Sequence, residues 1–179
     1  RIDVNTGKMI VVGQNPGNIT GWQTDHNGKL RVAITTDGVN QSVLYRDSEE
    51  QDFKPLLTTT FKETFAPLFF TFDNKNLYVS SNIGRDKASI VEYDIANKKE
   101  IKVLYENPDY DVNGLSYSRK RKVIEFAYYT GWKQEYHFFD KETKDIYNDL
   151  TSKLTGKELF VTGINKNEEK KRKKKTKWP

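Results

Sequence analysis

The 179-residue chain repeats one order of features three times, at a period of 46 to 47 residues. Each repeat has an aromatic residue, a polar turn, an alternating apolar segment, a second turn and a third apolar segment that ends in aspartate. The repeats cover 21–47, 69–94 and 115–140. Two marker positions recur at this period. One is an apolar residue in the alternating segment: Leu30, Leu77 and Val123. The other is the closing aspartate: Asp47, Asp94 and Asp140. Such self-similarity is typical of repeat architectures, so it constrains the fold before any single motif does.

The local pattern inside each repeat indicates β-strands. Apolar residues at every second position lie on one face of a pleated strand, and Asn-Gly and Asp-Gly pairs favour the tight hairpins between strands. A fourth apolar piece follows each closing aspartate: FKPLL, EIKVL or DIYNDL. Each repeat therefore predicts four short antiparallel strands. Because so small a sheet is stable only when neighbouring sheets stack on it, the pattern favours the blades of a β-propeller.

We therefore expect an all-β fold, an incomplete β-propeller with about three full four-stranded blades and partial blades at both ends. The predicted pieces of this 1–169 fragment are the last strand of a preceding blade, three blades and the first strand of a next blade: 1–14, 15–60, 61–107, 108–155 and 156–169. Three blades do not close a ring, since propellers typically have four to eight. The sequence favours a fragment of a longer chain and leaves open a ring completed by partner chains.

The basic charge is concentrated at the end of the chain. The formal net charge is +5, and seven lysine and arginine side chains lie between Lys170 and Lys177, which leaves −2 (5 minus 7) for the rest. We expect 170–179 to be a basic tail without regular structure, and the sequence does not decide whether this tail is native. Nucleic-acid binding is disfavoured, because a nucleic-acid reader usually spreads its basic groups over one face of a folded domain.

Composition excludes several classes of site. The chain has no cysteine, which rules out disulfides, thiolate metal ligands and cysteine nucleophiles. No apolar run approaches the ~18 residues of a membrane helix, so no membrane span is predicted. Aromatic residues make up 13% of the chain, which argues for a folded unit over a disordered one.

Six segments together resemble a known family: NPGNITGW, DHNGKLRVA, TDGVNQSVLYRD, FFTFDNKNLYVSSNIGRDK, YSRKRKV and HFFDKET. They resemble the propeller region of bacterial dipeptidyl aminopeptidase/acylaminoacyl peptidase-like enzymes, which belong to the prolyl oligopeptidase family of serine peptidases. The resemblance covers roughly 1–170 and is strongest over 15–95. The predicted architecture is also similar to that of TolB-like and WD-repeat-like propellers, which bind proteins.

The resemblance implies a non-catalytic part of a peptidase. In that family the propeller covers an α/β-hydrolase domain and filters peptide substrates by size, so the implied partners are that domain and those peptides. No G-x-S-x-G elbow occurs in this sequence, and we expect the chain alone not to be an enzyme. The alternative is a stand-alone TolB-like interaction propeller completed by homo-oligomerisation. The family's habit leaves the bacterial periplasm and the cytoplasm both open as locations.

The candidate catalytic and metal-binding groups favour structural interpretations. His26 is expected in an exposed turn, and His137 in a third strand. A triad of Ser116, His137 and Asp140 is disfavoured, because the odd offset from His137 to Asp140 places them on opposite faces of a regular strand. The acidic loop 107–114 lacks the bidentate glutamate of a calcium loop. We expect no catalytic residue, metal or cofactor.

Two turn residues are the candidates for an interface or an entry path. Arg85 in GRDK (84–87) and Trp132 in TGWK (130–133) lie on turns between second and third predicted strands. Such turns gather on one face of a propeller, and arginine and tryptophan are residue types that anchor interfaces when they become buried. The competing interpretation is an ordinary hairpin with a solvated cation.

Overall fold

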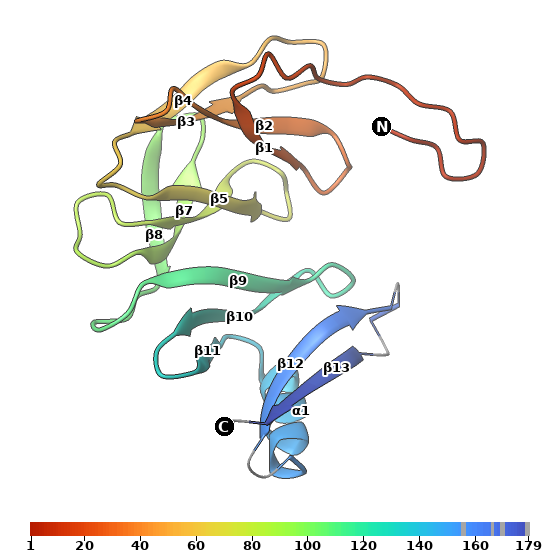
Figure 1. The fold of residues 1–179 in the computed structure, drawn as a ribbon, viewed down its shortest axis with the longest axis vertical. Helices are drawn as coiled ribbons and strands as arrows, with labels where there is room; N and C mark the ends of the chain where they lie inside the picture. The colour runs from red at the N-terminus through yellow and green to blue at the C-terminus, as the bar shows by residue number, and fades with distance from the viewer. Residues whose placement is uncertain (155–156, 166, 169–170, 178–179) are drawn as a thin grey trace. The chain divides into compact units, whose positions relative to one another are not determined.

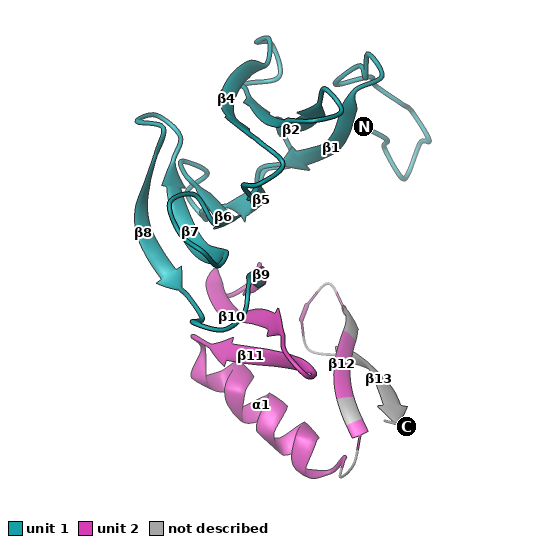
Figure 2. Cartoon of the chain, turned by 60° about the vertical axis from the view of Figure 1, so that its left-hand side comes forward, with its two compact units in different colours: residues 1–112 teal, residues 113–179 magenta. Residues whose placement is uncertain are grey.

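The chain forms two compact units, residues 1–112 and 113–179 (Figure 1, Figure 2). The structure is a computed structural model that describes residues 1–154, 157–165, 167–168 and 171–177. Its strands are antiparallel and follow one another along the chain as meanders, with one helix late in the sequence. No helix in these described ranges is long and apolar enough to cross a membrane.

The first unit contains two four-stranded sheets, each with its strands in sequence order. The first sheet comprises β1 (Ile19–Thr24), β2 (Leu30–Thr36), β3 (Gln41–Tyr45) and β4 (Lys54–Thr59). The second comprises β5 (Phe65–Phe70), β6 (Leu77–Ser81), β7 (Ser89–Asp94) and β8 (Lys99–Tyr105). The marker residues Leu30 and Leu77 open the second strand of each sheet, so this part of the repeat corresponds to one repeated sheet.

One apolar core joins these two sheets. Val32 of β2 and Leu77 and Val79 of β6 are fully buried, as predicted for the apolar face. Ala33 and Ser80 on the opposite face are buried as well, so both faces of these strands are covered. Ten buried side chains from both sheets form the cluster: Val32, Val43, Leu56, Phe65, Phe70, Leu77, Val79, Val91, Tyr93 and Ile95. The two sheets therefore pack on one another, as sheets of this size require.

The second unit has a three-stranded sheet in the order β11-β10-β9. Its strands are β9 (Val112–Ser118), β10 (Val123–Thr130) and β11 (Gln134–Phe138). After β11 the chain forms a helix, α1 (Lys141–Ser152), where the repeat predicted a fourth strand at DIYNDL. That prediction is wrong. The Asp140 side chain accepts a hydrogen bond from the Thr143 N–H and caps the helix, and helical spacing buries Thr143 and Tyr147.

The two ends of the chain also differ from expectation. In 1–18 the only pairing is an isolated bridge between Ile2 and Met9, where a complete last strand of a sheet was predicted over 1–14. At the other end β12 (Lys157–Ile164) pairs antiparallel with β13 (Lys171–Lys177). A first strand of a further blade was predicted over 156–169, where β12 lies, and a tail without regular structure over 170–179, where β13 lies. Residues 156, 166, 169–170 and 178–179 of these predictions lie outside the described residues. Strands pair through main-chain groups, so a lysine-rich sequence does not prevent a hairpin.

Candidate binding groove in the first unit

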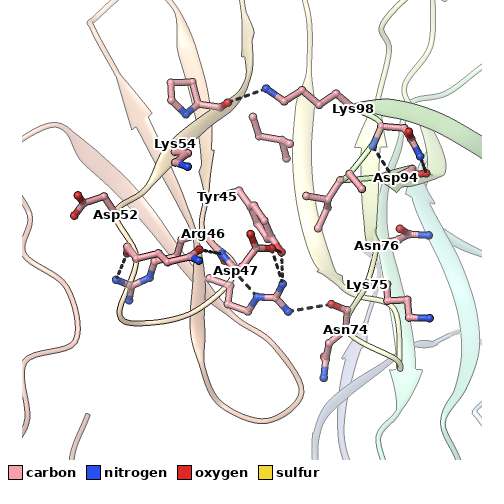
Figure 3. A pocket seen from close by; sticks show the side chains of 17 residues that line it. Tyr45, Arg46, Asp47, Asp52, Lys54, Asn74, Lys75, Asn76, Asp94 and Lys98 are labelled. Atoms are coloured by element: carbon pink, nitrogen blue, oxygen red, sulfur yellow. Dashed lines mark hydrogen bonds and ion pairs between the residues drawn. The ribbon is translucent and has the colours of Figure 1, made fainter.

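A groove of about 650 Å³ opens in the first unit, at the end of its two sheets where the β3–β4, β5–β6 and β7–β8 turns lie (Figure 3). Leu56 and Ile95 belong to the groove lining and are buried, so they give it an apolar floor. Exposed charged residues of both signs line it as well, among them Asp52, Lys54 and Lys98. A groove with an apolar floor and a few polar groups is the usual form of a site for a small molecule or a peptide segment.

Arg31 on β2 connects the two sheets beside this groove. Its Nη1 donates to the Asn74 carbonyl oxygen of the β5–β6 turn at 3.0 Å, and its Nη2 donates to the Tyr45 hydroxyl. The guanidinium also lies over the Phe70 ring at 5.0 Å and over the Tyr45 ring at 5.2 Å. Asp25 is 3.7 Å from Nη1 and balances the charge. Because the Arg31 side chain is only 12% exposed, these contacts hold it as a fixed part of the groove wall.

Arg46 shapes the other wall, the loop between β3 and β4. Its guanidinium stacks on the Phe53 ring at 4.4 Å, and its side chain donates only to main-chain oxygens. Those acceptors are the carbonyls of Leu30 at 2.9 Å, Glu49 at 3.2 Å, Gln51 at 3.4 Å and Val12 at 2.8 Å. A buried cation with four carbonyl acceptors ties the loop and the N-terminal segment to the sheet.

Further polar groups of the groove are hydrogen-bonded to neighbouring residues. The Tyr45 hydroxyl donates to Asp47 at 2.8 Å, and burial together with this acidic partner raises the pKa of Tyr45 to about 12. Bonds from the side chain and N–H of Asn97 lower the pKa of Asp94. The Lys98 ammonium donates to the Pro55 carbonyl at 3.4 Å, and so links the β7–β8 turn to β4 of the other sheet. The groove thus offers a phenolic hydroxyl with a raised pKa, carboxylates and ammonium groups as hydrogen-bonding and charged groups.

His26 belongs to the same inter-sheet contact, contrary to the prediction of an exposed turn. It is half-buried: its Nε2 lies 2.8 Å from the Phe70 carbonyl oxygen, and its N–H donates to the Asn74 side chain at 2.9 Å. Its ring stacks on Phe72 at 5.3 Å. The partners lie 44 to 48 residues away in the sequence, so the local pattern Asp-His-Asn-Gly carried no signal of them.

Arg85, a predicted interface residue, lies on the β6–β7 turn and is bonded within its own sheet. Its guanidinium donates to the Ser81 carbonyl at 3.2 Å and to the Glu100 carboxylate at 2.5 Å. The Ser81 hydroxyl donates to the same carboxylate at 2.7 Å. These bonds fasten the turn to β8 and leave 25% of the Arg85 side chain exposed. Its role in an interface stays a prediction.

Trp132, the second predicted interface residue, lies on the β10–β11 turn of the other unit and is 82% exposed. Its role in an interface stays a prediction too. Arg85 and Trp132 belong to different compact units of the chain.

Ser116, His137 and Asp140 make structural contacts in the second unit. The Ser116 hydroxyl donates to the buried carboxylate of Glu125 at 2.9 Å. Asp140 caps α1 and accepts from the Arg121 guanidinium at 2.8 Å, which holds the pKa of its carboxyl well below the ordinary value. His137 is exposed on β11, where desolvation and Lys144 lower its pKa.

The acidic loop at 107–114 uses its oxygens in turns. The Asn107 side chain accepts from the N–H groups of Asp109 and Tyr110, and the Asp111 carboxylate accepts from the Ala88 N–H at 2.7 Å. Within the described ranges no three His, Asp or Glu side chains are grouped as ligands for a metal ion.

Two comparisons with known proteins found no match. No protein-family model matches the chain, and no curated protein matches it significantly.

Proposed function

We propose that this chain is a non-catalytic binding module, a segment of a β-propeller from a prolyl oligopeptidase-type serine peptidase. In the parent it gates peptide substrates and docks onto the α/β-hydrolase domain. The observation that carries the proposal is the 46- to 47-residue repeat, which corresponds to successive antiparallel sheets with the same strand order. Four-stranded meanders that pack on one another are the building units of propellers.

The groove in the first unit supports the binding part of this proposal. Turns of two successive sheets line it, and its apolar floor and charged rim suit a peptide chain. Exposed Lys54 at the start of β4 and exposed Lys98 on the β7–β8 turn belong to different sheets and provide charge for a peptide carboxylate or an acidic loop of a partner domain. The six segments that resemble the peptidase family connect this geometry to peptide substrates.

Two assays on the purified full chain test the proposal. We expect no hydrolysis of chromogenic peptide amides, and hydrolysis that survives repurification would contradict a non-catalytic role. We also expect a fluorescein-labelled Ala-Pro peptide to bind, and the double substitution Lys54→Glu and Lys98→Glu to weaken that binding at least tenfold. Glu63→Lys, on an exposed site outside the groove lining, is the control. Peptide binding that is indifferent to both groove lysines would remove the groove from the proposal.

The stand-alone interaction propeller is the second candidate, and exposed apolar side chains near the N-terminus favour it. Val4, Met9 and Val11 are 87%, 78% and 77% exposed. Several exposed apolar groups within one short segment are typical of surfaces that another chain covers. A light-scattering mass of a dimer or larger supports this candidate, and a monomer at all concentrations contradicts it.

A further inference from the structure

In the first two sheets the third strand has a fourth strand beside it, and β11 is the corresponding third strand of the third sheet. β4 pairs with β3 and β8 pairs with β7, whereas β11 is the last strand of its sheet within the described part of the chain. A groove of about 480 Å³ lies along β11. It is lined by Tyr136 and Phe138 of that strand, by Tyr147 and Thr151 of α1, and by Lys157 and Leu159 of β12. An edge strand beside an aromatic groove is the geometry that accepts an added β-strand.

The helix packs on a face of this sheet. Tyr147 of α1 contacts the rings of Phe126, Tyr136 and Phe138, each with ring centroids 5.3 Å apart. Tyr136 and Phe138 are two residues apart on β11 and therefore lie on the same face of the sheet. The helix accordingly covers the face that these rings form, and β11 keeps its position as the terminal strand.

The edge of β11 lacks the devices that protect the other two terminal strands. β4 contains a proline and a register shift against β3, and β8 contains lysines and two register shifts against β7. β11 pairs with β10 in continuous register over all five residues, and its sequence QEYHF contains no proline and no lysine. Natural sheets protect edges with prolines, lysines and bulges, so a regular edge without them favours strand addition.

The chain carries a segment of the type that fits this edge. Asp3–Val12 aligns with Asp94–Val103 at an offset of 91 residues, and the alignment holds in three dimensions. The Ile2–Met9 bridge corresponds to the Tyr93–Glu100 pair at the β7–β8 turn.

The backbone of the two turns agrees as well. Gly7 has φ 71° and its counterpart Lys98 has φ 52°, so both turns use a left-handed residue at the same place. The turn that leads into Lys8–Val12 thus resembles the turn that leads into β8, the fourth strand of the second sheet. The apolar side chains of Lys8–Val12 are nevertheless exposed, Met9 by 78%, Ile10 by 54% and Val11 by 77%.

We propose that Lys8–Val12 of one copy of this chain adds antiparallel to β11 of a second copy, in the place of the missing fourth strand. In the added strand Met9 and Val11 lie on one face and Ile10 on the other, so the side chains of one face cover the aromatic groove beside β11. Reciprocal exchange between two copies closes a dimer, and a one-way exchange continues as a chain of copies. This inference does not rest on the peptidase relationship.

The first test measures solution mass and hydrogen exchange of the full chain over a range of concentrations. We expect a concentration-dependent dimer or larger species, and amides of 8–12 and 134–138 that become protected together as it forms. A monomer at every concentration overturns the proposal. Protection of 8–12 that does not change with concentration also overturns it, because the strand is then covered within its own chain.

Substitutions in the added strand give the second test. Val11→Pro removes a main-chain donor and should raise the dimer dissociation constant roughly tenfold or more, the effect of one hydrogen bond. Val11→Thr keeps a β-branched side chain at the same position and should preserve the dimer. An association that is unchanged by Val11→Pro overturns the proposal. The Lys54→Glu and Lys98→Glu chain should still dimerise, which separates this result from the peptide-binding assay.

Cross-linking locates the contact. The chain has no cysteine, so Val11→Cys and His137→Cys proteins can be mixed and treated with a short bismaleimide. We expect a cross-linked heterodimer from this mixture. Mixing Val11→Cys with Asp86→Cys, a position on the β6–β7 turn that is also exposed, should give none. Equal cross-linking in both mixtures overturns the assignment to β11.

Discussion

Replacing Arg31 by methionine tests the contact between the two sheets of the first unit. Methionine keeps much of the apolar stem and removes the guanidinium. The substitution deletes the bond to the Asn74 carbonyl, the bond to the Tyr45 hydroxyl and the stacking on Phe70. It leaves Asp25 with the N–H bonds from its own turn.

The expected loss can be worked out from these contacts. A hydrogen bond from a charged donor contributes about 1.5 to 3 kcal/mol, and a cation–π contact at a partly exposed site about 0.5 to 1 kcal/mol. The contributions overlap, because one guanidinium makes all of them and solvent reaches it at 12% exposure. We expect Arg31→Met to lower the free energy of unfolding of the first unit by about 2 to 3 kcal/mol. Arg31→Lys should lose more than half of this, since an ammonium cannot reproduce the planar fork.

Tryptophan fluorescence during urea unfolding measures the effect in one unit at a time. The chain has three tryptophans, Trp22, Trp132 and Trp178. In a Trp132→Phe and Trp178→Phe background, Trp22 reports the first unit alone. Lys54→Met on the groove rim is the control, with an expected change of less than about 0.5 kcal/mol. An Arg31→Met effect as small as that of the control would refute the assignment of Arg31 as the link between the sheets.

The other predictions concern a carboxylate, a helix cap and a glycine. The Arg1 side chain and the Leu30 N–H lower the pKa of Glu49 to about 2, so its stabilisation is complete above the ordinary value near 4.5 and is lost as the pH falls toward 2. Glu49→Gln should therefore flatten the fall in stability over that window, measured by urea unfolding at a series of pH values. Asp140→Ala should lower the stability of the second unit by about 1 to 2 kcal/mol, measured by the fluorescence of Trp132 alone. Gly114→Ala should cost about 1 to 3 kcal/mol in the same assay, because an added Cβ meets the Tyr128 ring at 1.9 Å.

Each of these substitutions has a matched control. Glu63→Gln on an exposed turn should leave the acid profile unchanged. Asp145→Ala, exposed on the same helix as the cap, should cost under about 0.5 kcal/mol. Combining Gly114→Ala with Tyr128→Ala should cost less than the sum of the two, because the second change removes the clash. Strict additivity would contradict the close approach.

The strands of the first unit could be predicted because the sequence marks them locally. Leu30 and Leu77 begin alternating segments between Asn-Gly- and Asn-Lys-type turns, and both are buried at the start of a second strand. An alternating pattern can be recognised from neighbouring residues in the sequence alone, so it was enough to place these strands.

The helix was missed because its signal overlaps with that of a short strand. DIYNDL reads as an apolar piece after a turn, like the fourth segments of the other repeats. The helical spacing of Thr143, Tyr147, Leu150 and Leu154 was present in the sequence, together with the cap at Asp140. The prediction followed the three-copy repeat, which indicated a strand here, although the helical spacing of these residues was the correct signal.

The groove residues could not be found from the sequence because their partners are distant. Arg31 occupies an ordinary strand position, and its bond to Asn74 crosses 43 residues. His26 reaches Phe70 across 44 residues, from a turn that reads as solvated. Contacts of this kind depend on how one sheet packs on the next, which no local pattern encodes.

The closing aspartates show why a marker can be correct while the element after it differs. Asp94 accepts from the N–H and side chain of Asn97 and starts a turn into β8. Asp140 accepts from the N–H of Thr143, three residues on, and starts α1. In both places the carboxylate accepts a hydrogen bond from the N–H three residues later. Both a tight turn and a helix N-terminus leave such an N–H without a main-chain acceptor. The repeated aspartate therefore predicts that the chain turns, and the residues after it decide between strand and helix. After Asp94, Lys98 has a positive φ and the chain returns to the sheet. After Asp140, the chain continues in helical turns. The helix at this point in the third repeat is also what leaves β11 as the last strand of its sheet.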